Sequence, residues 1–259
     1  MRSTPLLLLI VLASFGSSLT VAADFTVAQV REQLAASSSE RPADFSGKDL
    51  SDLDLSKLDF KYTKLVGANL FGARLVSSSF VGADLTRANL NGAWLMGTNF
   101  SGAKLIDSSL MSVVVLGGET KARPNFAGAD LSGARIIADL PGANLSRARL
   151  HEANLGVDIK NQGMGQMRTD LTGANLTGAD LSGADLNRAL LSFANLANAN
   201  LSGAQLYRAK LVGADLAGAD VSNADFTEAD LDGALFKGTK GLNAAKGMDK
   251  AANREKALF

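Results

Sequence analysis

Large apolar residues recur at every fifth position along most of the chain. The first series runs from Phe45 to Val115, and the last runs without a break from Leu171 to Phe236. A small residue, usually alanine, stands two positions before most of the large ones, and an aspartate or asparagine often lies between the two. Most units of the pattern therefore supply one large and one small residue that are candidates for a core.

A period of five matches neither regular secondary structure. An α-helix turns every ~3.6 residues, so this pattern would spread around its whole surface. A strand alternates its faces every two residues, so an odd period would reverse the buried face in each unit. A corner in every unit resolves the conflict, because each short extended side can then point its large and its small residue inward. Four sides close a square coil of about 20 residues, which repeats as a solenoid.

The phenylalanines support a coil of this length. Phe60, Phe80 and Phe100 are 20 positions apart, so the coil predicts that they stack on one side. Phe126 reaches the same side if an insertion of six residues lies within 116–125. The aromatic side chains therefore locate the first interruption of the repeat.

Two further irregularities follow. The period is one residue short between Ile136 and Leu140, and a second interruption lies near 156–169. Loops carry function more often than the scaffold that holds them. The insertions near 116–125 and 156–169 are therefore either functional segments or tolerated additions, and the sequence leaves both open.

The repeat resembles the A-(D/N)-L-x-x motif of the pentapeptide-repeat family, over about residues 43–237. It stands in Ala83-Asp84-Leu85, Ala174-Asn175-Leu176 and Ala179-Asp180-Leu181. The resemblance implies an all-β solenoid, a right-handed quadrilateral β-helix, and the length of the repeat region predicts about nine coils. Because the family is functionally diverse, the repeat alone assigns no activity.

The first 23 residues have the features of a secretory signal peptide. Arg2 is the only charge in 1–23, Leu6 to Phe15 form a short apolar run, and Val21 and Ala23 are small residues before Asp24. The apolar run is well short of the ~20 residues that span a bilayer. We therefore expect cleavage before Asp24, export, and no stable membrane insertion afterwards.

Short helices are predicted to cap both ends of the coil. Residues 24–42 combine a helix over 26–36 with a linker, and Thr26 with Gln29 matches a capping box. Residues 238–259 are rich in helix formers and predict a C-terminal cap helix. Both caps would cover open sheet edges, which otherwise promote aggregation.

Composition narrows the function classes. The chain has 26 basic and 26 acidic residues, so the formal net charge of zero argues against nucleic-acid binding through a basic surface. With no cysteine and one histidine, thiolate sites and histidine-rich metal sites are excluded. His151 lies beside Glu152, but no nucleophile can be placed with them. We expect no enzyme activity, no metal and no cofactor.

Residues one coil apart lie above one another, so the outward positions form columns. Most are polar, but two adjacent columns hold apolar residues and the only tryptophan. Their members are Arg74, Trp94 and Val114 in one and Val76, Met96 and Leu116 in the other. Arg74 lies one coil from Trp94, within reach of a cation–π contact. An exposed apolar patch often marks a binding site, unless the insertion after Val115 folds back and covers it.

Together these features predict an exported, non-enzymatic scaffold that binds a protein partner and is a monomer or a weak homodimer. We expect the periplasm as its compartment, or the thylakoid lumen in a photosynthetic organism. The alternative is a DNA mimic that inhibits or modulates a type II topoisomerase, as some members of the family resemble DNA in shape and charge. That alternative requires a strongly acidic surface and a cytoplasmic location.

Overall fold

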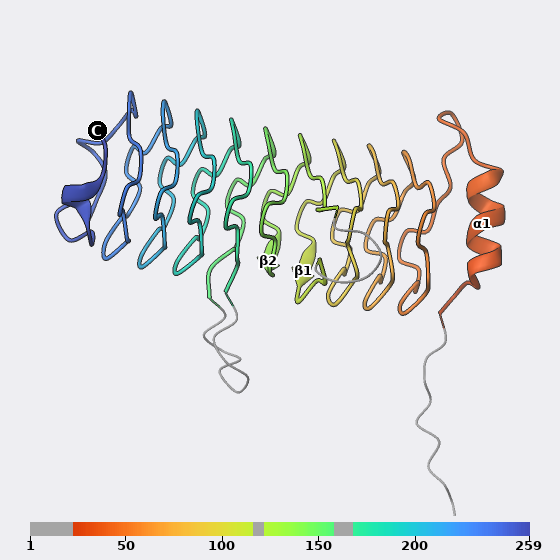
Figure 1. Ribbon diagram of the computed structural model, residues 1–259. Coiled ribbons are helices and arrows are strands. Elements are labelled where there is room, and N and C mark those ends of the chain that lie inside the picture. The colour runs from red at the N-terminus through yellow and green to blue at the C-terminus, as the bar shows by residue number, and fades with distance from the viewer. Residues whose placement is uncertain (1–22, 116–121, 158–167) are drawn as a thin grey trace, which may run out of the picture.

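The computed structural model describes residues 23–115, 122–157 and 168–259, and these residues form a rod of stacked coils (Figure 1). Helix α1 (Val27–Ala35) lies at one end of the rod and the C-terminus at the other. Strands β1 (Ser109–Met111) and β2 (Arg135–Ile137) pair in parallel near the middle, and the short 3-10 helix η2 (Arg254–Lys256) lies near the C-terminus. In the described part of the chain, no helix is long and apolar enough to cross a membrane. The predicted signal peptide falls almost entirely outside the described residues.

Among the described residues, parallel β-bridges join successive coils on four sides, except at one position between Val114 and Asp139. Regular coils pair residues 20 positions apart, as in Asp84 with Lys104. One side of the rod is the column Asp44, Lys64, Asp84, Lys104, Asp130, Arg149, Asp180, Asn200, Asp220 and Lys240. The described residues therefore form ten layers, one more than the nine expected from residues 43–237.

Regular units meet their backbone hydrogen-bonding requirement through the neighbouring layers and the corners. Leu85 N–H donates to the Lys104 carbonyl (2.7 Å), and Lys104 N–H donates to the Ala83 carbonyl (2.9 Å). The corner residue is often a glycine with positive φ, such as Gly82 at 65°. The outward Asp84 carboxylate accepts from Thr86 N–H (3.1 Å), which fixes the turn.

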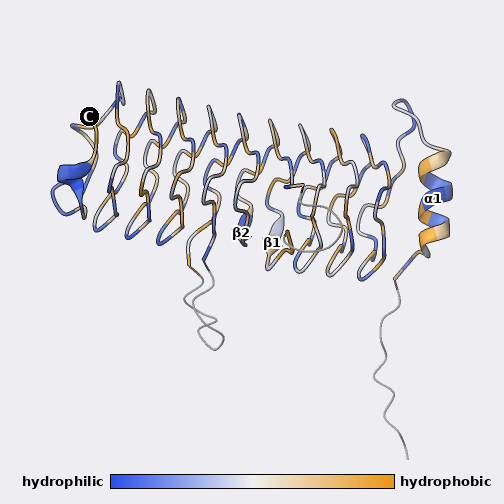
Figure 2. Ribbon diagram, viewed as in Figure 1, coloured by the Kyte–Doolittle hydropathy of each residue, from blue (hydrophilic) through white to orange (hydrophobic). Residues whose placement is uncertain are grey.

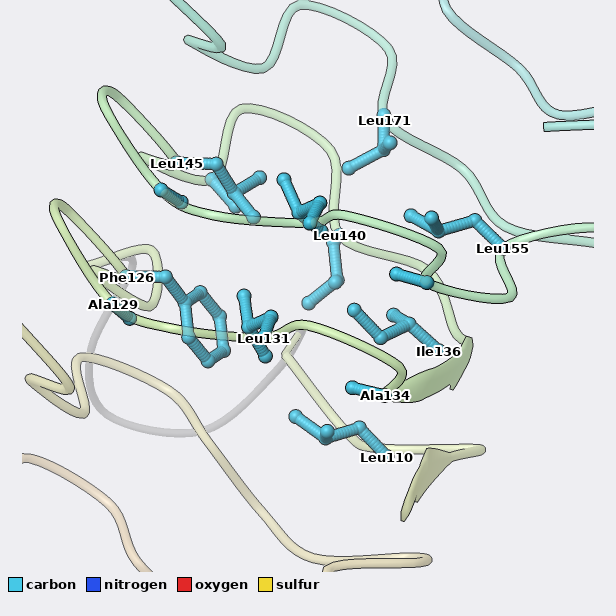
Figure 3. Packing of buried hydrophobic residues seen from close by; sticks show 14 of the residues in the cluster. Leu110, Phe126, Ala129, Leu131, Ala134, Ile136, Leu140, Leu145, Leu155 and Leu171 are labelled. Carbon is cyan, nitrogen blue, oxygen red and sulfur yellow. The ribbon is translucent and has the colours of Figure 1, made fainter. Parts of the chain in front are cut away.

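The large and small residues of the repeat fill the centre of the rod as predicted. Phe60, Phe80, Phe100 and Phe126 form one stack, with successive ring centroids 4.6, 5.1 and 5.0 Å apart. Asn99 pairs with Asn125, which confirms the insertion between them. Figure 3 shows the later layers continuing the core, with side chains from successive coils lying above one another.

The N-terminal edge is covered by α1. The predicted capping box is present, since Gln29 N–H donates to Thr26 Oγ1 and Thr26 N–H donates to Gln29 Oε1. The helix has an apolar and a polar face (Figure 2), and Val30 is fully buried against the first coil. Before the helix, Asp24 N–H donates to the Asp49 carbonyl and its carboxylate accepts from Asp49 N–H, both at 2.8 Å.

The C-terminal cap helix predicted over 238–259 is wrong. This segment instead adds a tenth layer, in which Lys240, Lys246, Ala252 and Leu258 pair with the layer before. Its only helix is η2, with three residues. The reason lies at the corners, because Gly241, Gly247 and Asn253 have φ of 73°, 67° and 56°. Left-handed residues at this spacing interrupt a helix but turn a coil whose sides are one residue longer than usual.

A buried threonine in the second layer is expected to destabilise the protein. Thr98 Oγ1 donates to the Leu75 carbonyl in the preceding layer (2.7 Å), whereas the Oγ1 of Thr63 is buried without a partner. We expect Thr63→Val to raise the free energy of unfolding by about 1 kcal/mol, because it removes an unsatisfied polar group without changing shape.

The matched control is Thr98→Val, which loses a hydrogen bond and should cost about 1 kcal/mol. Urea unfolding of both variants measures the difference. Equal destabilisation by the two substitutions would show that the Thr63 hydroxyl is satisfied in solution.

Candidate functional site

The Trp94 column is formed by Arg74, Trp94 and Val114, which the bridges place in three successive layers as predicted. The Arg74 guanidinium lies 4.8 Å from the centroid of the Trp94 ring, so the expected cation–π contact is present. Trp94 and Val114 are half-buried and Arg74 is exposed. The column therefore offers a rigid aromatic and aliphatic surface held by the sheet beneath it.

Asp54 extends this column by one layer toward the N-terminal end. Its Oδ2 lies 3.8 Å from Arg74 Nε, with the two side chains 62% and 48% exposed, so the ion pair contributes little to stability. Hydrogen bonds from the Ser56 side chain and backbone lower the pKa of the Asp54 carboxyl, and Arg74 adds to this effect. The carboxylate therefore stays ionised and orients the guanidinium that lies over the indole.

The second predicted column is less accessible than expected. Val76 is half-buried, but Met96 is only 1% exposed, so Met96 cannot contact a partner in this structure. The chain after the first insertion passes next to Met96, since Gly97 N–H donates to the Ala122 carbonyl (2.8 Å). Leu116 lies outside the described residues.

A hollow of about 470 Å³ opens beside Val113, the residue before Val114, where the repeat is one residue short. Its volume is within the range of small-ligand sites. The residues that line it are Ser112, Val113, Ile137, Ala138, Asp139, Arg168 and Leu190. The spacing of the repeat locates the deletion but not the hollow, because only the stacking of layers shows which groups the missing residue leaves apart.

Both interruptions of the repeat border this face of the rod. The first insertion, near 116–125, begins directly after Val115, and the second, near 156–169, ends with Arg168 and Thr169. Asp170, the next residue, pairs with Asp139 in the same column that contains Val114 in the layer before. The Trp94 column, the hollow and one end of each insertion therefore lie on one side of the molecule.

The structure also gives His151 a neighbour that the sequence did not reveal. Ser182 Oγ lies 2.9 Å from His151 Nδ1, and Glu152 Oε1 lies 3.6 Å from Nε2. The Ser182 hydroxyl donates to Asp180 Oδ1 (2.7 Å), and the Glu152 side chain is 73% exposed. Because the serine proton points to Asp180 and the carboxylate is in solvent, this cluster lacks the buried support of a catalytic triad.

Metal binding has no candidate site within the ranges that the structure describes, because no group of three His, Cys, Asp or Glu residues comes together there. Large exposed apolar side chains occur elsewhere on the described surface. Tyr62, Phe71 and Phe193 are 55%, 50% and 68% exposed. The Tyr62 and Phe193 rings lie over Gly82 and Gly213 of the following layer, which accounts for both by local packing.

Comparison with known proteins matches the chain to the family model for pentapeptide repeats, with copies over residues 43–70, 63–102, 138–156, 169–206 and 204–240. The crystal structure of HetL, a pentapeptide repeat protein involved in heterocyst differentiation regulation in the cyanobacterium Nostoc sp. strain PCC 7120, is 32% identical. The match covers 90% of this chain and 94% of HetL, with a TM-score of 0.49.

Two other solved structures are similar over less of the chain. A pentapeptide repeat protein from the Arabidopsis thaliana thylakoid lumen is 30% identical, covering 57% of this chain and 69% of that one, with a TM-score of 0.25. QnrB1, a plasmid-mediated fluoroquinolone resistance protein, is 18% identical, covering 77% and 89%, with a TM-score of 0.32. No curated protein matched the chain.

Proposed function

Because this chain belongs to the pentapeptide repeat family, whose members fold as right-handed quadrilateral β-helices, we propose that it is an exported, non-enzymatic scaffold that binds a protein partner. The Trp94 column is the contact surface. The observation that carries this proposal is the rigid Arg74–Trp94 pair beside a hollow, on the face that both insertions border. Tryptophan and arginine are enriched among the residues that dominate binding energy in protein interfaces.

The charge pattern of the rod supports a protein partner over mimicry of nucleic acid. Basic and acidic residues alternate along one column, where Lys104 lies 3.8 Å from Asp84 and Arg149 lies 3.5 Å from Asp130. Such pairing cancels the field that a uniformly acidic surface would project. This surface therefore offers little that a topoisomerase could recognise as DNA.

Export to the periplasm, or to the thylakoid lumen, belongs to the same proposal. Asp24 is the first residue after the proposed cleavage site, and among the described residues it is also the first to pair with the coil, through Asp49. N-terminal sequencing of the protein from fractionated cells tests this step. A chain that begins at Asp24 in the exported fraction is expected, whereas an uncleaved cytoplasmic chain would refute it.

Replacing the indole tests the contact surface. We expect Trp94→Ala to weaken capture of the partner by at least tenfold, because truncation of a central interface residue typically costs about 2 kcal/mol or more. Tagged mature protein is used for capture from extracts of the exported compartment, with quantitative mass spectrometry as the readout.

The matched control is Phe71→Ala, which removes an exposed aromatic side chain from a different column. It should capture the partner as well as the unaltered protein does. Equal capture by Trp94→Ala and the unaltered protein would refute the assignment of this face.

A further inference from the structure

The ladder between successive coils is interrupted at one place beside the Trp94 column. In the regular layers, Val114 N–H donates to the Ala93 carbonyl (2.8 Å), and the Val114 carbonyl accepts from Leu95 N–H (2.7 Å). Asp139 occupies the equivalent position one layer later, since it pairs onward with Asp170. Among the described residues, however, no bridge joins Val114 to Asp139.

Among the residues that the structure describes, the interruption leaves four backbone groups without a partner. By the rule of the other layers, Asp139 N–H would donate to the Val113 carbonyl, and Val115 N–H would donate to the Asp139 carbonyl. Neither hydrogen bond forms, and within the described part of the chain these groups have no other partner. An entire rung of the parallel ladder is missing.

The missing residue explains the open rung. Strands β1 and β2 pair normally up to Met111 and Ile137, and Ser112 N–H still donates to the Ile137 carbonyl (2.9 Å). Ser112 then turns its corner with φ of 54°, whereas the next layer proceeds from Ile137 to Asp139 without a corner residue. The two chains no longer pair here, and the hollow of about 470 Å³ opens at this place, lined by residues of both layers together with Arg168 and Leu190.

We propose that this hollow binds a short extended peptide segment of the protein partner, so this inference rests on the proposed function. An extended peptide alternates N–H and C=O groups at the spacing of a ladder, which is what two open donors and two open acceptors on facing strands require. Burying these groups unsatisfied would be costly, so a ligand that pairs with them gains affinity.

The side chains around the open rung match such a segment. Val113, Ile137 and Ala138 are buried and provide an apolar wall for one side chain of the peptide. Asp139 and Arg168 are exposed at the hollow and carry opposite charges, so they complement a basic and an acidic residue of the peptide. The Trp94 column lies adjacent, through Val114, and extends the contact.

The test uses a phage-displayed library of random heptapeptides as the probe, selected on the mature protein. The key variant inserts one glycine between Ile137 and Ala138, which restores the regular unit and should close the rung. Peptides enriched on the unaltered protein are expected to bind the insertion variant at least tenfold more weakly. N-methylation of the central peptide bonds should also reduce binding at least tenfold, since it removes backbone donors.

Amide hydrogen exchange provides a readout that does not depend on selection. In the free protein, Val115 and Asp139 N–H should exchange at least tenfold faster than the paired Val114 and Leu140 N–H groups. A saturating concentration of a selected peptide should slow the exchange of the Val115 and Asp139 amides. The insertion variant should protect the amide of residue 139 without peptide, which also shows that the variant is folded.

Three results would overturn the proposal: no peptide is enriched, the insertion variant binds the peptides equally well, or Val115 and Asp139 amides are already protected in the free protein. The last result would mean that the chain itself fills the hollow.

Capture of the partner separates this inference from the proposed function. Capture that depends on Trp94 but survives the glycine insertion would remove the peptide site alone.

Discussion

Phe80→Ala is expected to lower the free energy of unfolding by about 3–5 kcal/mol, the usual cost of removing a buried aromatic ring. The Phe80 side chain is fully buried, and its ring stacks at 4.6 Å on Phe60 and at 5.1 Å on Phe100. Its removal leaves a cavity that the hydrogen-bonded coils cannot collapse to fill. The loss of stability therefore includes the free energy of transferring the ring out of water and the van der Waals contacts that both neighbouring rings lose.

Urea unfolding measured by circular dichroism gives the overall effect, and the fluorescence of Trp94 reports on the adjacent layer. Phe71→Ala is the control, since the Phe71 side chain is 50% exposed and its loss should change stability by less than about 0.5 kcal/mol. A loss below about 1 kcal/mol for Phe80→Ala would contradict the stacked core.

Gly247→Ala is expected to cost about 2–5 kcal/mol and to release the last layer. A Cβ at Gly247 would lie 2.5 Å from the backbone nitrogen of Thr227 and 2.6 Å from its Cα, so backbone must move. Overpacking of this kind costs about 1–3 kcal/mol. The positive φ of 67° adds about 1–2 kcal/mol for a residue other than glycine.

The matched substitution is Gly233→Ala, at a corner with the same φ of 67° but with nothing within 4 Å of the added Cβ. Gly233→Ala should lower the free energy of unfolding only by the cost of placing a residue other than glycine at positive φ. Hydrogen exchange at Lys246 and Ala252, which donate to Ala224 and Ala229 at 2.7 and 2.8 Å, reports whether the last layer remains paired. Unchanged protection of these amides in Gly247→Ala would disprove the tight stacking of this layer.

The spacing of residues in the sequence is enough to predict part of the candidate site. Arg74, Trp94 and Val114 are one coil apart in the sequence, so their spacing is enough to predict their alignment and the cation–π contact. The burial of Met96 could not be predicted in the same way, because it depends on which segments pack together in the fold and not on spacing. The repeat spacing did not predict the hollow either, because a missing pair of backbone hydrogen bonds depends on how two layers face each other.

At the ends of the rod, too, the local sequence predicts one feature and tertiary packing decides another. The capping box at Thr26 is a local pattern of side-chain and backbone groups, and the predicted helix follows it. Residues 238–259 contain good helix formers, yet they form a layer because Phe236 and the preceding coil offer an apolar surface and an open edge. Docking onto this edge outweighs the weak helix propensity of the segment.

The repeat pattern was sufficient to specify the coil, its period, its core and the positions of its three irregularities. These properties follow from units that contact only their neighbours, so each depends on a few residues at known spacing. Packing between layers decided what lies where the spacing changes: the tenth layer, the pairing of Ser182 with His151, the burial of Met96 and the open rung at Asp139. There the outcome depends on competition between segments far apart in the chain, which no local pattern records.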